Sequence, residues 1–115
     1  MTIEAIQAIC MGFPGATEDI KWEDRLAFCV CDKMFLITVP DEVPQRASFK
    51  ATEEEYEELI NREGIVPSPF LAKHKWVRIN DIKVLSKKEW TYYIGQSYQL
   101  ITSKLPAKKR KELGL

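Results

Sequence analysis

The sequence predicts an α+β fold in which helices pack on a mainly antiparallel sheet of about four to six strands. Three observations support this prediction. Short segments rich in β-forming residues follow one another through connectors too short for repeated crossover helices. Two capping-box patterns, at residues 52–55 and 86–89, indicate that helices begin there. The length of 115 residues and the hydrophobic content of 45% are typical of one globular domain, so we expect a single domain over residues 1–115.

The chain is expected to begin with a short helix. Ile3, Ile6 and Cys10 recur at helical spacing, and Thr2 can cap the first turn. A Pro-Gly pair at residues 14–15 would end the helix in a turn. Residues 16–25 are mostly polar and are expected to form a connector.

A β-hairpin is expected next. Residues 26–31 and 34–39 are rich in β-forming side chains, and only Asp32 and Lys33 separate them. Asp-Lys is not a favoured hairpin turn, so the sequence leaves the turn type open. A further short strand is predicted over residues 47–50.

The second expected helix begins after Thr52. The Thr52 hydroxyl can accept from the Glu55 amide while the Glu55 carboxylate reaches back, and the acidic first turn suits the helix dipole. Helix formation therefore explains the run of glutamates, which does not indicate a metal or acid–base site. Gly64 is expected to end this helix. Its predicted apolar stripe consists of Tyr56, Leu59 and Ile60.

The stretch over residues 64–79 joins two parts of opposite charge. Residues 1–64 carry 6 Lys and Arg against 14 Asp and Glu, whereas residues 65–115 carry 11 against 3, so the net charges are −8 and +8. This asymmetry favours an anionic partner for the second part, unless the two parts face each other and cancel. Residues 76–79 alternate as a half-buried strand should, and Trp76 is expected to be buried.

A long helix is expected to begin after Ser86, which forms the second capping box with Glu89. The helix should stop near Pro106, and a basic cluster follows at residues 108–111. Its predicted apolar face consists of Trp90, Ile94, Ile101 and Leu105, with Ser97 and Tyr98 on or beside it.

The three cysteines are expected to be reduced and to bind no metal. Cys29 and Cys31 would share one face of a strand, where a disulfide between them would distort the backbone. As metal ligands they would need Cys10 or His74, at no recognised spacing. No cofactor-binding motif occurs, and we predict no cofactor.

The sequence favours a protein that is not an enzyme. The only histidine, His74, lies between Lys73 and Lys75 and is expected to be exposed. No nucleophile-elbow, zinc-protease, P-loop or dinucleotide-binding motif is present. No apolar run reaches the ~20 residues that span a bilayer, and the first residues do not resemble a signal peptide. A cytoplasmic protein without a membrane partner is therefore expected.

Five motifs occur in order along the chain, and these are TEDIKW, KMF, GIVPSPFLAKHKWVRI, QSY and KLPAKKR. Together they resemble the MmcQ/YjbR-like family of small bacterial proteins, from Pro14 to Arg110. The resemblance implies a fold like that of CyaY or of secretion chaperones. It also implies DNA binding, because family members are often described as DNA-binding through a double-wing motif. Many members have His immediately before the tryptophan, where this chain has Lys75, so no histidine role is carried over to His74.

The first functional hypothesis is weak, phosphate-directed binding of duplex DNA with little sequence specificity. Backbone amides and basic side chains near the start of the last long helix could hold phosphate. The neutral chain, with a pI near 6.6, argues for weak binding. The predicted nucleic-acid-binding residues are Lys73, Lys75, Arg78, Lys87 and Lys88, with Lys104 and residues 108–111 extending the surface.

The alternative hypothesis is a module that binds another protein or a peptide, as the likeness to secretion chaperones implies. A contiguous basic face would favour nucleic acid, and a large exposed apolar patch would favour protein. The groove predicted for this alternative is lined by Phe35, Phe49, Phe70 and Trp76.

Overall fold

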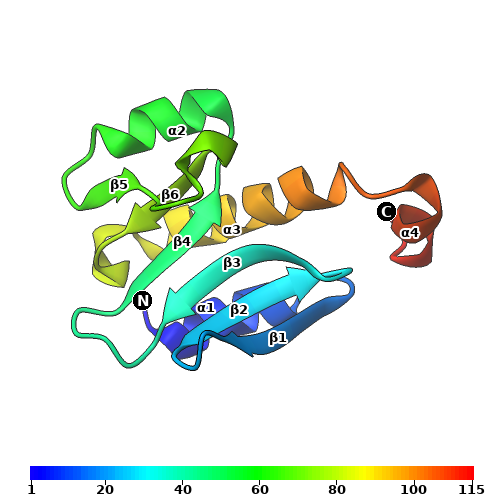
Figure 1. The fold of residues 1–115 in the computed structure, drawn as a ribbon, viewed down its shortest axis with the longest axis horizontal. Helices are drawn as coiled ribbons and strands as arrows, with labels where there is room; N and C mark the ends of the chain where they lie inside the picture. Colours follow the sequence, from blue (N-terminus) through cyan, green and yellow to red (C-terminus); the bar gives the residue numbers. More distant parts are fainter.

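The computed structural model describes residues 1–115 and contains one six-stranded sheet with helices packed on it (Figure 1). The strands are β1 (Ala16–Lys21), β2 (Arg25–Val30), β3 (Lys33–Val39), β4 (Arg46–Lys50), β5 (Ile65–Pro67) and β6 (Trp76–Ile79). The α-helices are α1 (Ile3–Met11), α2 (Glu53–Ile60), α3 (Lys87–Thr102) and α4 (Ala107–Glu112), and two short 3-10 helices are η1 (Ala72–His74) and η2 (Ile82–Val84).

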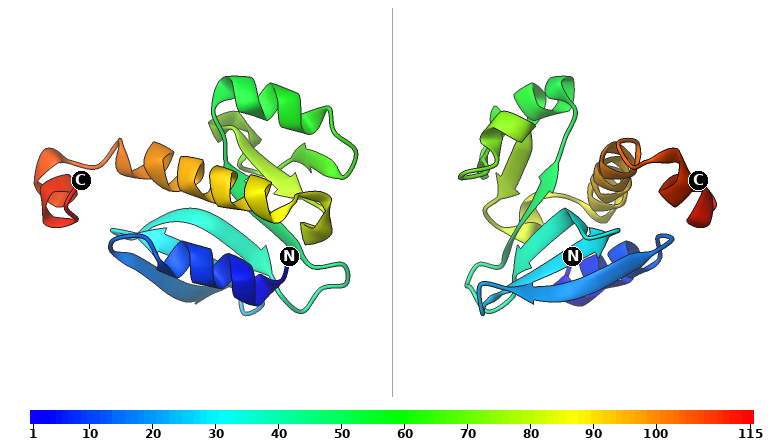
Figure 2. Two further views of the ribbon diagram at one scale, coloured as in Figure 1. Left: turned by 180° about the vertical axis from the view of Figure 1, so that it is seen from behind. Right: turned by 45° about the vertical axis from the view of Figure 1, so that its right-hand side comes forward.

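The strand order is β1-β2-β3-β4-β6-β5, and every neighbouring pair is antiparallel. This confirms the predicted α+β class and the predicted sheet. Helices α1 and α3 cover one face of the sheet, as the view from behind shows (Figure 2). The opposite face, which we call the open face, is turned toward the viewer in Figure 1 and carries no helix over its centre.

The hydrophobic core lies between the sheet and helices α1 and α3. Because side chains alternate along a strand, each strand contributes one set to the core and the other to the open face. Leu36 of β3, Phe49 of β4 and Val77 of β6 lie opposite one another in register and are all part of the core. Their neighbours Ile37, Ser48 and Arg78 therefore belong to the open face.

The prediction of a polar connector over residues 16–25 is wrong. Six residues of this segment form β1, which pairs with β2 from Ala16 opposite Val30 to Lys21 opposite Arg25. β1 is an edge strand, and none of its side chains is fully buried. Backbone hydrogen bonds to β2 hold this strand in the sheet. Its side chains do not need to be buried, and the apolar alternation that identifies a half-buried strand is therefore absent from its sequence.

The hairpin turn lies one residue earlier than predicted. Val30 pairs with Lys33, so Cys31 and Asp32 form the turn, with φ of +49° and +63°. Two positive φ values in a two-residue loop are those of a type I′ turn, whose twist matches that of the strands. Cys31 consequently does not share a strand face with Cys29, contrary to the prediction.

Both capping boxes are confirmed. Thr52 Oγ1 accepts from the Glu55 amide at 3.1 Å, and Ser86 Oγ accepts from the Glu89 amide at 3.1 Å. Helix α2 ends at Ile60, however, four residues before the predicted end. Gly64 instead has φ +85° in the turn into β5, where an added Cβ would lie 2.9 Å from the Val84 side chain.

Helix α3 ends at Thr102, so Leu105 of the predicted apolar face lies beyond it. Trp90 and Ile94 are fully buried as predicted, and Tyr98 is buried beside them. The buried Ser97 hydroxyl donates to the carbonyl of Phe35 at 2.6 Å and accepts from the amide of Lys50 at 3.1 Å. It thereby ties β3 and β4 to α3 and has a structural role. None of the helices combines the length and apolar composition needed to cross a membrane.

Candidate functional site

The four aromatic residues predicted to line a peptide-binding groove do not line a common groove. Phe35 and Phe49 are fully buried in the core beneath α3, because their positions on β3 and β4 face the helices. Phe70, in the loop before η1, is 99% exposed. Trp76 is only 5% exposed, which confirms its predicted burial.

A different groove lies on the open face of the sheet. It has a volume of about 620 Å³, within the range that ligand pockets commonly occupy. We call it the sheet-face groove. Its lining consists of Trp22, Arg25, Met34, Ile37, Val39, Arg46, Ala47, Ser48, Ser68, Pro69, Phe70, Leu71 and Arg78.

Three arginines make the sheet-face groove cationic. Arg25 begins β2, Arg46 begins β4 and Arg78 lies in β6, and no carboxylate is part of the lining. Strand pairing brings them together, since Arg46 and Arg78 flank Ser48 on the open face of neighbouring strands. A cationic lining on a neutral protein is suited to an anionic ligand.

Each arginine already has a partner at the rim of the groove. Arg25 Nη1 lies 2.6 Å from Asp24 Oδ1, and Arg46 Nε lies 2.7 Å from Glu42 Oε2. In both pairs the carboxylate is solvent-exposed and the arginine is half-buried, and pairs so open to water add little to stability. An incoming anion can therefore replace these carboxylates at modest cost. Arg78 has no carboxylate partner, and its Nε donates to the amide oxygen of Asn80 at 2.9 Å.

The lining of the groove also contains aliphatic and aromatic side chains. Met34, Ile37 and Val39 of β3 supply the aliphatic floor. Trp22, in the turn between β1 and β2, is 69% exposed, and Phe70, in the loop after β5, is 99% exposed. The groove thus combines cationic side chains with accessible aromatic rings.

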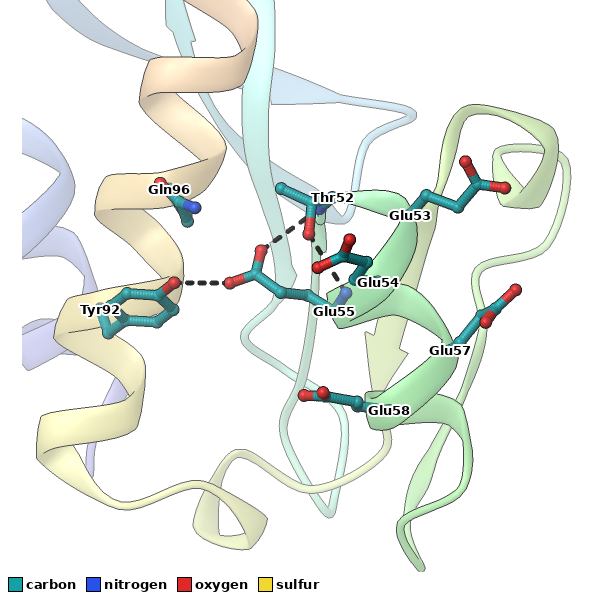
Figure 3. A pocket seen from close by; sticks show the side chains of 8 residues that line it. All are labelled: Thr52, Glu53, Glu54, Glu55, Glu57, Glu58, Tyr92 and Gln96. Atoms are coloured by element: carbon teal, nitrogen blue, oxygen red, sulfur yellow. Dashed lines mark hydrogen bonds between the residues drawn. The ribbon is translucent and has the colours of Figure 1, made fainter.

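A second cavity, the acidic cleft, lies between α2 and α3 and has a volume of about 780 Å³. Glu55 points across it to Tyr92, whereas Glu53 and Glu57 point away (Figure 3). The Tyr92 hydroxyl donates to Glu55 Oε2 at 2.7 Å, and this bond raises the pKa of Tyr92. Its lining is Thr52, Glu53, Glu54, Glu55, Glu57, Glu58, Tyr92 and Gln96.

The acidic cleft follows from helix capping and offers no metal centre. Glu55 is already committed to the Thr52 capping box and to Tyr92. No group of three or more His, Cys, Asp or Glu side chains lies close enough together to hold a metal ion.

The structure distributes the five predicted nucleic-acid-binding residues over three places. Lys73 is exposed on η1, and Lys75 follows it with its Nζ 4.9 Å from the centre of the Tyr56 ring. Lys87 and Lys88 are exposed at the start of α3, on the side of the sheet that the helices cover. Of the five, only Arg78 lines the sheet-face groove.

Sequence reasoning missed Arg25 and Arg46. Both lie in the part of the chain whose net charge is −8, so a count of charges by segment hides them. One sequence signal could have found Arg46. It directly precedes Ala47, which is buried, and alternation along a strand therefore predicts that the Arg46 side chain lies on the opposite face.

The remaining titratable candidates from the sequence are the three cysteines and His74. Cys10, Cys29 and Cys31 are free thiols. Burial raises the pKa of Cys10 to about 12 and also raises the pKa of Cys29. His74 is exposed on η1 as predicted, and its backbone carbonyl accepts from Lys50 Nζ at 2.5 Å.

Comparison with known proteins identifies relatives in sequence and in structure. The family model described as YjbR matches residues 11–100. The crystal structure of Deinococcus radiodurans protein DR2400, with the family-model domain DUF419, superposes with a TM-score of 0.88 at 29% identity and covers 99% of this chain and 88% of that one. A protein from Pseudomonas syringae, Northeast Structural Genomics Consortium target PsR293, gives a TM-score of 0.59 at 24% identity over 74% of this chain and 86% of that one, which shows a shared fold. No curated protein matches the chain.

Proposed function

This chain belongs to the YjbR family, and from this premise we propose that it binds nucleic acid and is not an enzyme. The family resemblance implies DNA binding, and the sheet-face groove offers a surface for it. The predicted likeness to CyaY and to secretion chaperones plays no part in this proposal.

The observation that carries the proposal is the set of three arginines without a carboxylate in the lining of the sheet-face groove. A guanidinium presents a planar fork of donors that matches the oxygens of a phosphate group. Three such groups on one open face, flanked by exposed aromatic rings, suit a polyanion with aromatic bases.

Binding of this kind is expected to be weak and salt-dependent. Phosphate contacts release counterions, so log K falls against log salt by about 0.9 per contact for a duplex and about 0.7 for a single strand. Three arginine contacts then give a slope of roughly −2 to −3. No helix lies over the centre of the open face to enter a major groove, so little sequence specificity is expected (Figure 1).

The test is a salt titration by fluorescence anisotropy with labelled oligonucleotides. The first variant replaces two groove arginines, Arg46→Gln with Arg78→Gln. The slope of log K against log salt should become less steep by roughly 1.4 to 1.8, which is the contribution of two phosphate contacts. The matched control, Lys87→Gln with Lys88→Gln, removes the same charge from the covered side and should leave the slope unchanged. A third pair, Lys73→Gln with Lys75→Gln, tests the remaining predicted residues.

One result would contradict the class of ligand, and another would contradict the location of the binding surface. No binding by the wild type at ~50 mM salt would remove nucleic acid as the ligand, since non-specific phosphate contacts are strongest at low salt. If the Lys87 and Lys88 pair flattened the slope and the arginine pair did not, nucleic acid would bind at the start of α3 instead.

A second candidate function is binding of an acidic peptide. The aliphatic floor of Met34, Ile37 and Val39 favours it, because it could bury an apolar side chain between the arginines. An acidic peptide with a central leucine that binds the wild type but not an Ile37→Asn variant would support this function. The same variant keeps the charge of the groove, so it should weaken oligonucleotide binding much less if the arginines dominate.

A further inference from the structure

We propose that the sheet-face groove takes a single nucleic-acid strand, with unpaired bases stacked on Trp22 and Phe70. This inference rests on the nucleic-acid binding proposed above and specifies the class of ligand. It is carried by the backbone conformation, the exposure and the placement of these two side chains.

Both aromatic residues have strained backbone conformations. Trp22 has φ +50° and Phe70 has φ +66°. Bulky side chains rarely adopt positive φ, and Gly, Asn or Asp would form such turns with less strain. Strain of this kind persists where the surrounding structure imposes it and is frequent at sites that clamp a ligand. The turns themselves therefore do not explain why an aromatic residue occupies either position.

Both side chains are also exposed without a polar partner. Trp22 is 69% exposed and Phe70 is 99% exposed. The third exposed aromatic residue, Tyr92, donates a hydrogen bond to Glu55, whereas the indole N–H of Trp22 has no partner and the Phe70 ring has no polar group. An exposed ring loses unfavourable contact with water when a flat aromatic ligand stacks on it.

The two rings line one groove and come from segments near opposite edges of the sheet. Trp22 joins β1 to β2 near one edge of the sheet, and Phe70 follows β5, the strand at the other edge. Arg46 and Arg78 lie on the strands between these edges. A cationic groove that follows the backbone, with aromatic rings on which bases stack, is the arrangement by which single strands are bound.

The same arrangement discriminates against a duplex. In a duplex the bases are stacked on one another, so their faces are inaccessible to side chains at the protein surface. Only an unpaired base can cover Trp22 or Phe70. We therefore expect a single strand to bind more tightly than the duplex DNA predicted from the sequence.

The experiment compares a ten-nucleotide oligothymidine, an abasic strand of the same length and a duplex of the same length at one low salt concentration. The wild type should bind the oligothymidine about 100-fold more tightly than the abasic strand, because the abasic strand lacks both stacking contacts, and at least about 10-fold more tightly than the duplex. Trp22→Leu and Phe70→Leu should each weaken oligothymidine binding by about 10-fold, because a stacked base contributes a factor of roughly 5 to 150. Neither variant should change the salt slope, since the arginines remain.

Tyr92→Leu is the matched control, because Tyr92 is an exposed aromatic residue outside the groove and should not affect binding. The intrinsic fluorescence gives a second readout. Trp76 and Trp90 are buried, so the bound oligothymidine should quench mainly the emission of Trp22, and the Trp22→Leu variant should lose this quenching.

The outcomes separate the two proposals. Equal affinity for the oligothymidine, the abasic strand and the duplex, with no effect of the two leucine variants, would overturn base stacking and leave phosphate-directed binding intact. No binding of any of the three at low salt would overturn both proposals and favour the acidic peptide.

Discussion

Trp76 and Trp22 show how differently one residue type can be used in this molecule. Trp76 lies in an internal strand and is 5% exposed, whereas Trp22 lies in a turn and is largely exposed. Trp90, the third tryptophan, is fully buried, and its Nε1 donates to the carbonyl of Ile82 at 2.8 Å. The two buried rings contribute to stability, and the exposed one is available for binding.

We predict that Trp76→Ala lowers the free energy of unfolding by ~3–5 kcal/mol, as other large-to-small changes at buried sites do. Trp22→Ala is the control and should change it by less than ~0.5 kcal/mol. Denaturant melts of both variants measure the difference. A loss below ~1 kcal/mol for Trp76→Ala would mean that the ring is not packed as described.

The thiols are predicted to react in order of exposure. The thiolate is the reactive form, and burial raises the pKa of Cys10 to about 12, so almost none of it is ionised near neutral pH. Cys31 is only half-buried, in the β2–β3 turn. Iodoacetamide should therefore modify Cys31 before Cys29 and Cys10, as mass spectrometry of the native protein can measure. Modification of Cys10 first would contradict the burial of α1 against the sheet.

Local sequence patterns predicted some elements well and others poorly. The two capping boxes are confirmed because all their hydrogen bonds lie within four residues of sequence. Strand β1 was missed because its pairing with β2, and not its own side chains, holds it in the sheet. The hairpin turn was misplaced by one residue because the positive φ values of Cys31 and Asp32 leave little trace in residue types.

The ends of α2 and α3 are joined by an ion pair between Arg62 and Glu89, whose Nη1 and Oε2 atoms lie 2.5 Å apart. The hydrogen bond from Arg62 is the main cause that lowers the pKa of Glu89 below its ordinary value of 4.5. A carboxylate with a lowered pKa in the folded state stabilises the fold above its ordinary pKa, and this stabilisation is lost as the pH falls through the lowered value.

We therefore predict that Arg62→Gln raises the pKa of Glu89 toward 4.5 and destabilises the protein at pH 7 but not below the lowered pKa. An NMR titration of the Glu89 carboxyl carbon, with unfolding measured across the same pH range, tests both parts. Asp24→Asn, which removes an exposed pair elsewhere, is the control. An unchanged titration of Glu89 in Arg62→Gln would show that the pair does not form in solution.

The whole molecule does not separate charge as its sequence does. Strand β4, from the acidic part, pairs with β6 from the basic part, and α3 packs on β3 and β4. The sheet-face groove accordingly takes Arg25 and Arg46 from one part and Arg78 from the other. The fold class, the burial of Trp76 and the exposure of His74 could be predicted from the sequence. The groove could not, because its arginines and aromatic rings come from four separate segments of the chain that the strand order brings together.

The most direct test of the groove as the binding surface is an NMR map of the ¹⁵N-labelled protein titrated with a ten-nucleotide oligothymidine. The predicted result is a set of shift changes confined to the open face, with the Trp22 indole and the side-chain Nε signals of Arg46 and Arg78 among the largest. The amides of Lys87 and Lys88 should not move. Shift changes centred on the start of α3 or on α4, with the signals of the open face unchanged, would contradict the account.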